Sequence, residues 1–151
     1  MLRITICAVG RLRGGPEAAL VGDYLDRLGK AGRGIGFSPV TVREVDDRKA
    51  PAALLEACAL GALRVALDER GEVLSSPDFA GWLARWRDEG TRDVAFLIGG
   101  ADGLPDTVRR ECARSLSFGP MVWPHMLARV MLAEQLFRAA SILKGGPYHR
   151  A

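Results

Sequence analysis

Apolar runs alternate with amphipathic stretches along the whole chain. Residues 2–9, 64–68 and 93–99 are almost continuously apolar and rich in β-branched residues. Such runs are typical of strands that are buried on both faces of a parallel sheet. Residues 40–45 alternate instead, which predicts a strand nearer an edge, and a short strand-like piece precedes residues 117–123. The pattern predicts an α/β fold with an open parallel sheet of about five strands.

Helical spacing of apolar residues separates these strands. It predicts helices over residues 17–28, 52–63, from Ser76 onward and 126–143. In the third of these, Ser76 offers a cap, Pro77 a first-turn proline and Asp78 an acid near the helix start. The last helix has an apolar face broad enough to cover more than one neighbour. Strands and helices therefore alternate, as in a helix-covered sheet whose ligands bind at the carboxyl ends of the strands.

Residues 29–36 contain four glycines in the sequence GKAGRGIG. Glycine raises the entropic cost of ordering the backbone, so this segment is the best candidate for a mobile loop. A plain connector between two elements is the alternative.

The composition fits one globular domain over residues 1–151. Apolar residues make up 48% and charged residues 26% of the chain, and no apolar stretch reaches the roughly 20 residues that span a bilayer. The start lacks the pattern of a signal peptide, so we expect a cytoplasmic protein with no membrane partner. The three cysteines are far apart and share no metal-ligand spacing, so we expect reduced thiols and no metal site.

The positive charge is concentrated toward the end of the chain. The net charge is +3, but from Thr107 onward seven Arg or Lys residues face two Glu residues. A polyanion could dock there. The candidate contacts are Arg11, Arg13, Arg109, Arg110, Arg114, Arg129, Lys144 and Arg150.

Glycines follow the third long apolar run. Gly99 and Gly100 end it, and they permit either a tight strand-to-helix turn or the close approach of a ligand to the backbone. The sequence GGADG matches neither the dinucleotide fingerprint nor the P-loop, which disfavours a pyrophosphate ligand. A second loop, SFGPMVW at 117–123, and the strand end at Leu67 would meet Gly99 at the same sheet edge. Three such ends suit a ligand of adenosine size.

Several motifs together carry a resemblance to a known family. LIGGADGL, PHMLARVMLAEQLFRA and the terminal PYHR closely resemble the RlmH family of the SPOUT superfamily, the ribosomal large-subunit pseudouridine N3-methyltransferases. ITICAVGRL and ALDERGEVLSS resemble it too, so the similarity covers essentially the whole chain.

The resemblance implies a cofactor, a fold detail and two partners. The cofactor is S-adenosylmethionine, and its site would fall on Leu67, Gly99, Gly100, Phe118, Gly119, Pro120, Met121, Val122 and Trp123. The fold would carry a deep C-terminal trefoil knot, which no periodicity argument supplies. The partners would be a second copy of the chain, in a homodimer, and 23S ribosomal RNA in the assembled ribosome, methylated in its helix 69.

The chemistry that the resemblance implies requires cationic donors. N3 of a pseudouridine is an imide nitrogen, which becomes nucleophilic as its proton leaves and negative charge spreads over the carbonyl oxygens. The implied catalytic residues are Arg138, His149 and Arg150, with Tyr148 beside the base. His149 could accept the imide proton or, charged, stabilise the anion. A solvated terminal tail is the structural alternative for these residues.

Four further residues have expected structural roles. His125 is predicted to cap the last helix or support the cofactor loop. Glu134 and Gln135 are expected to pair with Arg129 or Arg138, and Asp102 could orient the glycine loop.

Two other function classes remain open from the sequence. A dinucleotide-dependent oxidoreductase would also use glycine loops on an α/β sheet, although its fingerprint is missing. A non-catalytic ribosome-binding factor would keep the basic residues and bind no methyl donor.

Overall fold

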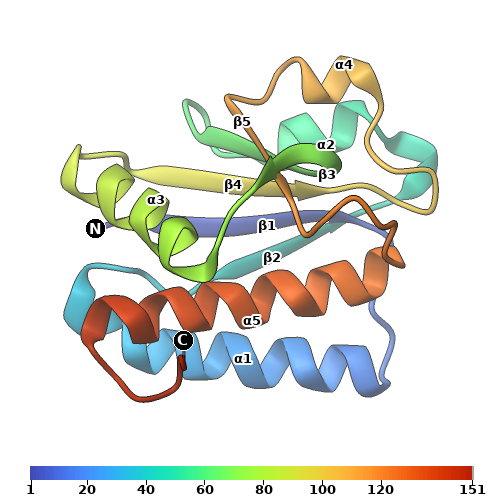
Figure 1. Ribbon diagram of the computed structural model, residues 1–151. Helices are drawn as coiled ribbons and strands as arrows, with labels where there is room; N and C mark the ends of the chain where they lie inside the picture. Colours follow the sequence, from blue (N-terminus) through green and yellow to red (C-terminus); the bar gives the residue numbers. More distant parts are fainter. Residues whose placement is uncertain (151) are drawn as a thin grey trace.

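A five-stranded sheet with helices on both faces forms the protein (Figure 1). The computed structural model describes residues 1–150, and Ala151 lies outside the described residues. The strands are β1 (Arg3–Val9), β2 (Thr41–Val45), β3 (Leu63–Val73), β4 (Asp93–Ile98) and β5 (Arg114–Ser117). All neighbouring strands pair in parallel in the order β2-β1-β4-β3-β5. The predicted α/β class is confirmed, as is the edge position of residues 40–45.

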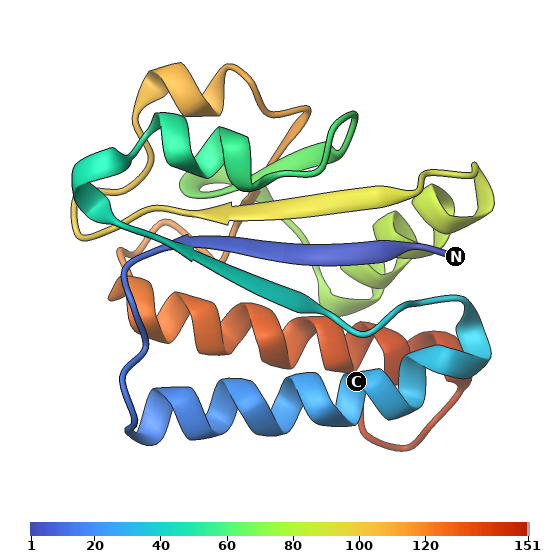
Figure 2. The ribbon, with the colours of Figure 1, turned by 180° about the vertical axis from the view of Figure 1, so that it is seen from behind.

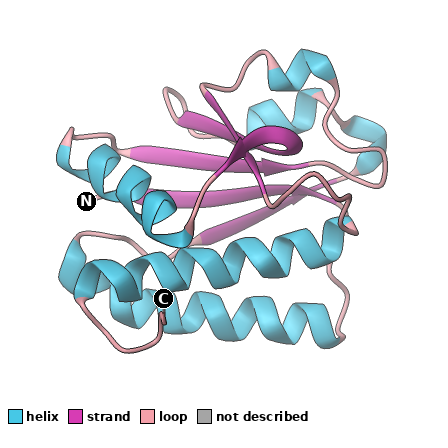
Figure 3. Ribbon diagram, viewed as in Figure 1, coloured by secondary structure: helices cyan, strands magenta, loops and turns pink. Residues whose placement is uncertain are grey.

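The helices form a layer on each side of the sheet. They are α1 (Pro16–Gly32), α2 (Ala52–Ala57), α3 (Ser76–Asp88), α4 (Asp106–Arg109) and α5 (His125–Lys144), with short 3₁₀ helices η1 (Arg33–Ile35) and η2 (Asp47–Lys49). Helices α1 and α5 run in the same direction and lie side by side against one face, while α2 and α4 cover the other (Figures 1 and 2). Figure 3 shows the strands of the sheet between these two helical layers.

Alternating side chains of the strands supply both cores. In β1, Ile4 and Ile6 face the core with α1, α3 and α5, whereas Cys7 and Val9 face the core with α2 and α4. All four are at most 4% exposed. Two-sided burial explains why the sequence of the strand is almost continuously apolar.

The boundaries of α2 and α3 differ from the sequence predictions. Helix α2 ends at Ala57 because Cys58 is extended and Gly61 then takes a left-handed conformation, so the predicted helix to residue 63 is wrong. The cap of α3 is Ser75, whose Oγ accepts a hydrogen bond from the Asp78 backbone N–H at 3.1 Å, and Ser76 is already helical.

The sequence predicts either a mobile loop or a plain connector over residues 29–36, and the structure shows neither over the whole segment. Its first half completes α1 and its second half forms η1. The segment is anchored by Phe37, which is 1% exposed and whose backbone N–H donates to the carbonyl of Gly32. Burial of this ring against the close-packed Gly32 backbone offsets the entropy that the glycines would otherwise keep.

Helix α5 packs on α1 and α3, which confirms the expectation of more than one neighbour. No helix within residues 1–150 is long and apolar enough to cross a bilayer. Cys7, Cys58 and Cys112 are free, and the described residues contain no group of metal-binding side chains.

Candidate active site

A cavity of about 530 Å³ lies at the carboxyl ends of the strands. Three segments line it: the end of β3 with the residues after Leu67, the glycine loop after β4, and the loop between β5 and α5. Of the predicted cofactor residues, the cavity brings together Leu67, Gly99, Gly100, Phe118, Gly119, Met121, Val122 and Trp123. Pro120 is the predicted residue that does not line it.

The glycine loop after β4 turns back on itself. A Cβ at Gly99 would lie 2.4 Å from the carbonyl of Gly103, and the Gly103 N–H donates to the Gly100 carbonyl at 3.0 Å. Gly103 has φ +75°, a conformation that favours glycine. Glycine is therefore required at position 99 by the loop's own backbone, and the turn that results forms one wall of the cavity.

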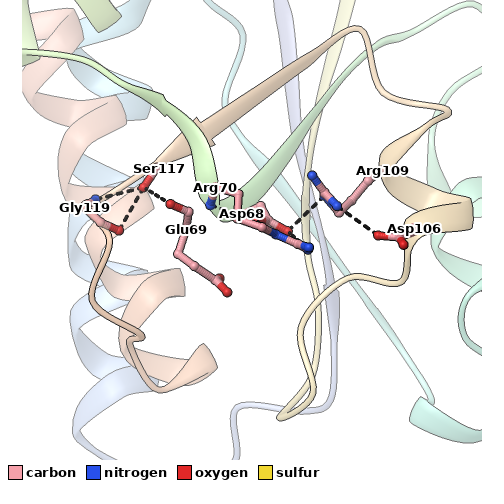
Figure 4. A network of polar contacts seen from close by, with 7 residues as sticks. All are labelled: Asp68, Glu69, Arg70, Asp106, Arg109, Ser117 and Gly119. Atoms are coloured by element: carbon pink, nitrogen blue, oxygen red, sulfur yellow. Dashed lines mark hydrogen bonds and ion pairs between the residues drawn. The ribbon is translucent and has the colours of Figure 1, made fainter.

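Ser117 fixes the loop that leads from β5 to α5. Its Oγ accepts the Gly119 N–H at 3.0 Å and lies 3.1 Å from the carbonyl of Glu69, within donating distance (Figure 4). The residue is 4% exposed. One hydroxyl thus ties the loop to the end of β3. Sequence analysis missed Ser117, although a serine two residues before a glycine is the signal of a hydroxyl-closed turn.

A buried carboxylate lies beside the cavity at Asp68. Its side chain is 4% exposed, and Arg70 donates to both its oxygens at 2.9 and 3.0 Å. Arg109 of α4 approaches from the other side, with Nε 3.1 Å from Oδ2 (Figure 4). The hydrogen bonds from Arg70 outweigh burial and lower the pKa of Asp68. Asp68 therefore keeps its negative charge at the edge of the cavity.

Two lining residues have expected structural roles. His125 lines the cavity at the start of α5, and its side chain makes no capping hydrogen bond, so of its two predicted roles the cap is wrong and support of the cofactor loop stays a prediction. Asp102 also lines the cavity and is exposed, and its side chain forms no hydrogen bond within residues 1–150. The bond between Gly103 and Gly100 holds the loop instead.

The predicted catalytic residues form a second cluster at the other end of α5. Arg138 donates to Glu134 at 3.2 and 2.6 Å and lies 3.1 Å from Nδ1 of His149. Tyr148 donates to the same carboxylate at 2.6 Å, and the guanidinium of Arg138 lies over its ring at 4.8 Å. Arg150 is exposed. Glu134 thus anchors the tail, and its predicted pairing with Arg138 is confirmed.

The tail cluster and the cavity are well separated within one chain. Ala128 is the last residue of α5 that lines the cavity, and Arg138 follows ten positions later on the same helix. At about 1.5 Å per residue, this rise along the helix axis is about 15 Å. No described residue from Arg138 onward lines the cavity of its own chain.

The predicted basic residues differ in exposure. Arg129 is 1% exposed, and it bonds to Glu44 and to the carbonyl of Gly10 at 3.0 Å. Its predicted role as an RNA contact is wrong, because its charge is buried inside the fold. Arg109 is held by Asp68 and Asp106 and is partly exposed.

Apolar side chains are exposed at the rim of the cavity, and three of the four residues that follow also line it. Met121 is 73%, Val122 80%, Trp123 43% and Leu127 40% exposed. Contiguous apolar surface of this kind marks interaction sites in folded proteins. We call these four residues the apolar patch.

Comparison with known proteins identifies the family. The family model described as "Predicted SPOUT methyltransferase" matches residues 2–149. Relatives named "Ribosomal RNA large subunit methyltransferase H" are 58% identical in Dinoroseobacter shibae and 59% identical in Roseobacter denitrificans, each over 155 aligned positions that cover 99% of both chains.

Solved structures share the fold at low identity. A probable methyltransferase from Bordetella pertussis aligns with a TM-score of 0.57 at 16% identity, covering 92% of this chain and 95% of that one. A Legionella pneumophila methyltransferase in complex with S-adenosylmethionine aligns with a TM-score of 0.51 at 17% identity, covering 94% and 66%. The full-length match to the family model and the near-60% identity of the relatives lead to one assignment: this chain belongs to the SPOUT methyltransferases, and within them to the RlmH family.

Proposed function

We propose that the protein methylates N3 of a pseudouridine in helix 69 of 23S ribosomal RNA, on assembled ribosomes, with S-adenosylmethionine as methyl donor. The observation that carries the proposal is the cavity at the strand ends, in a chain of the RlmH family. The names of the relatives support an RNA of the large ribosomal subunit as substrate.

The cavity residues fit S-adenosylmethionine in size and charge. The volume of the cavity lies within the usual range for small-molecule sites, and its walls consist mainly of apolar side chains and backbone. Asp68, Glu69 and Asp102 line it and offer carboxylates to a ligand that carries sulfonium and ammonium groups. The glycine loop and the loop at Gly119 would hold the adenosine part through backbone groups. The bound donor supplies an activated methyl group, so the protein need not generate an electrophile.

The tail cluster supplies what the receiving base needs. Arg138 cannot lose its proton, so its contact with His149 makes Nδ1 the acceptor and leaves the ring hydrogen on Nε2. In this arrangement His149 is a donor toward the base, and with Arg138 it would stabilise charge on the imide oxygens. This geometry favours charge stabilisation over proton abstraction by His149, so the N3 proton would pass to solvent water as the methyl group leaves the sulfonium sulfur for N3. Tyr148, held by Glu134 and Phe137, would bound the base on one side.

A homodimer would unite the two clusters. The cavity and the tail lie at opposite ends of α5, and the apolar patch lies beside the cavity. We propose that a second copy covers the patch and brings its own tail to the cavity, so that each active site uses both chains. We further propose, from the family resemblance, that the final helix passes through a loop of the chain in a trefoil knot.

The test is methyl transfer to a defined nucleotide. Ribosomes from a strain that lacks this gene are incubated with the protein and labelled S-adenosylmethionine, and the labelled nucleotide is mapped by mass spectrometry. Label on N3 of a helix 69 pseudouridine is expected. Ribosome binding without label, together with no binding of the donor, would favour a non-catalytic ribosome-binding factor instead.

A further inference from the structure

A second hollow opens on the far side of the residues that follow Leu67. Here β3 makes an excursion: Leu116 of β5 pairs with both Leu67 and Glu72, so the residues between those two are left out of the ladder. Asp68 and Glu69 of this excursion line the donor cavity, whereas Arg70 and Gly71 line the second hollow. We call this hollow the arginine groove, because Arg70, Arg109 and Arg114 line it.

Positive charge dominates the lining of the arginine groove. Its three guanidinium groups face one acidic lining residue, Glu72. Asp68 pairs with both Arg70 and Arg109, and it lines the donor cavity and not the groove. Its carboxylate therefore contacts the two guanidinium groups from the side away from the groove. Figure 4 shows the contacts that join Asp68 to Arg109 and Arg109 to Asp106.

The guanidinium groups are held in place with most of their donors unused. Arg70 bonds to Asp68 through Nε and Nη2, and Arg114 bonds to Glu72 through Nη1 at a long 3.4 Å. Arg114 also lies over the ring of Trp82 at 5.4 Å, which limits its rotamers. Planar, pre-positioned guanidinium groups with free N–H donors match the oxygens of phosphate better than a lone mobile cation does.

We infer that the arginine groove binds a backbone phosphate of the RNA substrate, one step along the strand from the base that enters the donor cavity. The excursion of β3 forms a wall that the arginine groove and the donor cavity share. An RNA strand that lies in the groove therefore passes directly beside the donor cavity. This inference rests on the proposed function, since it takes RNA as the substrate. It assigns a role to Arg70, which charge counting along the sequence did not single out.

The experiment compares three charge-neutralising variants: Arg70→Gln, Arg114→Gln and the control Arg33→Gln. Arg33 is exposed in η1, makes no side-chain hydrogen bond within the described residues, and lies away from the groove. The side chains of Arg70 and Arg114 are 57% and 43% exposed, and Asp68 keeps Arg109 as a partner when Arg70 is replaced, so each variant should still fold, which thermal unfolding checks. Binding to ribosomes is measured at several salt concentrations, and donor binding is measured separately by calorimetry.

Each groove variant should weaken ribosome binding by about tenfold at low salt, the size of one charge-assisted contact. Each should also lower the slope of log affinity against log salt by about 0.7–0.9, the value for one phosphate contact. The affinity for S-adenosylmethionine should stay unchanged. If the salt dependence of ribosome binding has the same slope in Arg70→Gln and Arg114→Gln as in Arg33→Gln, the inference is overturned.

Failure of the groove and failure of the proposed function give different results. If the groove variants bind ribosomes like the control while wild-type protein methylates the pseudouridine, the groove inference alone is wrong. If wild-type protein transfers no methyl group but the variants lose affinity and slope, the groove stands without the reaction. Polyuridylate and polyglutamate serve as competitor probes, and displacement of ribosomes by polyglutamate alone would make the groove an acidic-peptide site and overturn the RNA assignment.

Discussion

Asp68 carries its charge where burial alone would favour the neutral acid. Hydrogen bonds from Arg70 hold the pKa of this carboxyl below its usual range, against the effect of burial. A carboxyl with a depressed folded pKa stabilises the protein above its unfolded pKa of about 3.9, and the contribution is lost as the pH falls through the folded value.

Asp68→Asn should therefore lower the free energy of unfolding by about 1–3 kcal/mol at pH 7, because it leaves the partly buried Arg109 without this partner. The deficit should shrink as the pH falls below about 4. Urea unfolding of the wild type and of Asp68→Asn at pH 7 and at pH 3 measures this difference in the free energy of unfolding. A deficit of equal size at both pH values would show that packing, and not charge, makes the contribution.

The role of His149 also depends on one contact, the one with Arg138. With Nδ1 engaged by Arg138, its free Nε2 carries the hydrogen and acts as a donor. His149→Ala should lower kcat by about a hundredfold or more, the low end for a positioned proton-bearing group, with donor affinity unchanged. His149→Gln keeps an N–H donor and should retain more activity than His149→Ala. Equal inactivity of the two variants, with a rate in wild type that rises as the imidazole deprotonates, would instead indicate a general base.

Periodicity along the chain predicts the elements but not their ends. The five strands and the long helices follow from apolar runs and helical spacing, because these elements bury their side chains against each other. The excursion of β3 depends on a distant residue, because Leu116 pairs with both Leu67 and Glu72. The end of α2 depends on the extended backbone of Cys58 and on the left-handed Gly61 that follows it. Segment 29–36 is ordered by one buried ring, Phe37, which lies outside the glycine-rich stretch itself.

The same limit applies to the charges of the candidate site. The lining of the cavity could be placed at the strand ends from topology alone, since parallel strands end at one edge. The sequence predicts Arg129 and Arg109 alike as candidate RNA contacts. In the structure, Arg129 is buried against Glu44, whereas Arg109 links α4 to Asp68. Burial is a property of packed elements, so a count of basic residues cannot separate structural from exposed arginines.

Arg129 joins α5 to the ends of β1 and β2. It bonds to Glu44 of β2 and to the carbonyl of Gly10, which follows β1. Arg129→Met should lower the free energy of unfolding by about 3 kcal/mol, because Glu44 and the carbonyl lose a buried cationic partner. Arg85→Met, at an exposed position of α3, is the matched control and should change it by less than about 0.5 kcal/mol. A double-mutant cycle with Glu44→Gln isolates the pair, and an interaction energy near zero would contradict the assigned role.

At the scale of the whole molecule, the separation of about 15 Å along α5 between the cavity and Arg138 decides how many chains make one active site. A single chain holds both halves at opposite ends of α5, and the apolar patch beside the cavity leaves a surface for a second copy. If the tail acts in the partner's cavity, each active site combines the cavity of one chain with the tail of the other chain.

Mixed dimers test this directly. Gly119→Val alters the cavity loop at φ +112°, where a side chain is strained, and His149→Ala alters the tail. Each variant alone should be inactive. When the two are unfolded together and refolded as a mixture, half of the dimers combine one chain of each kind, and each such dimer has one complete site if the tail acts across the interface. Activity should then recover to about a quarter of the wild-type value. If tail and cavity of the same chain worked together, every site in the mixture would lack one part and the mixture would stay inactive.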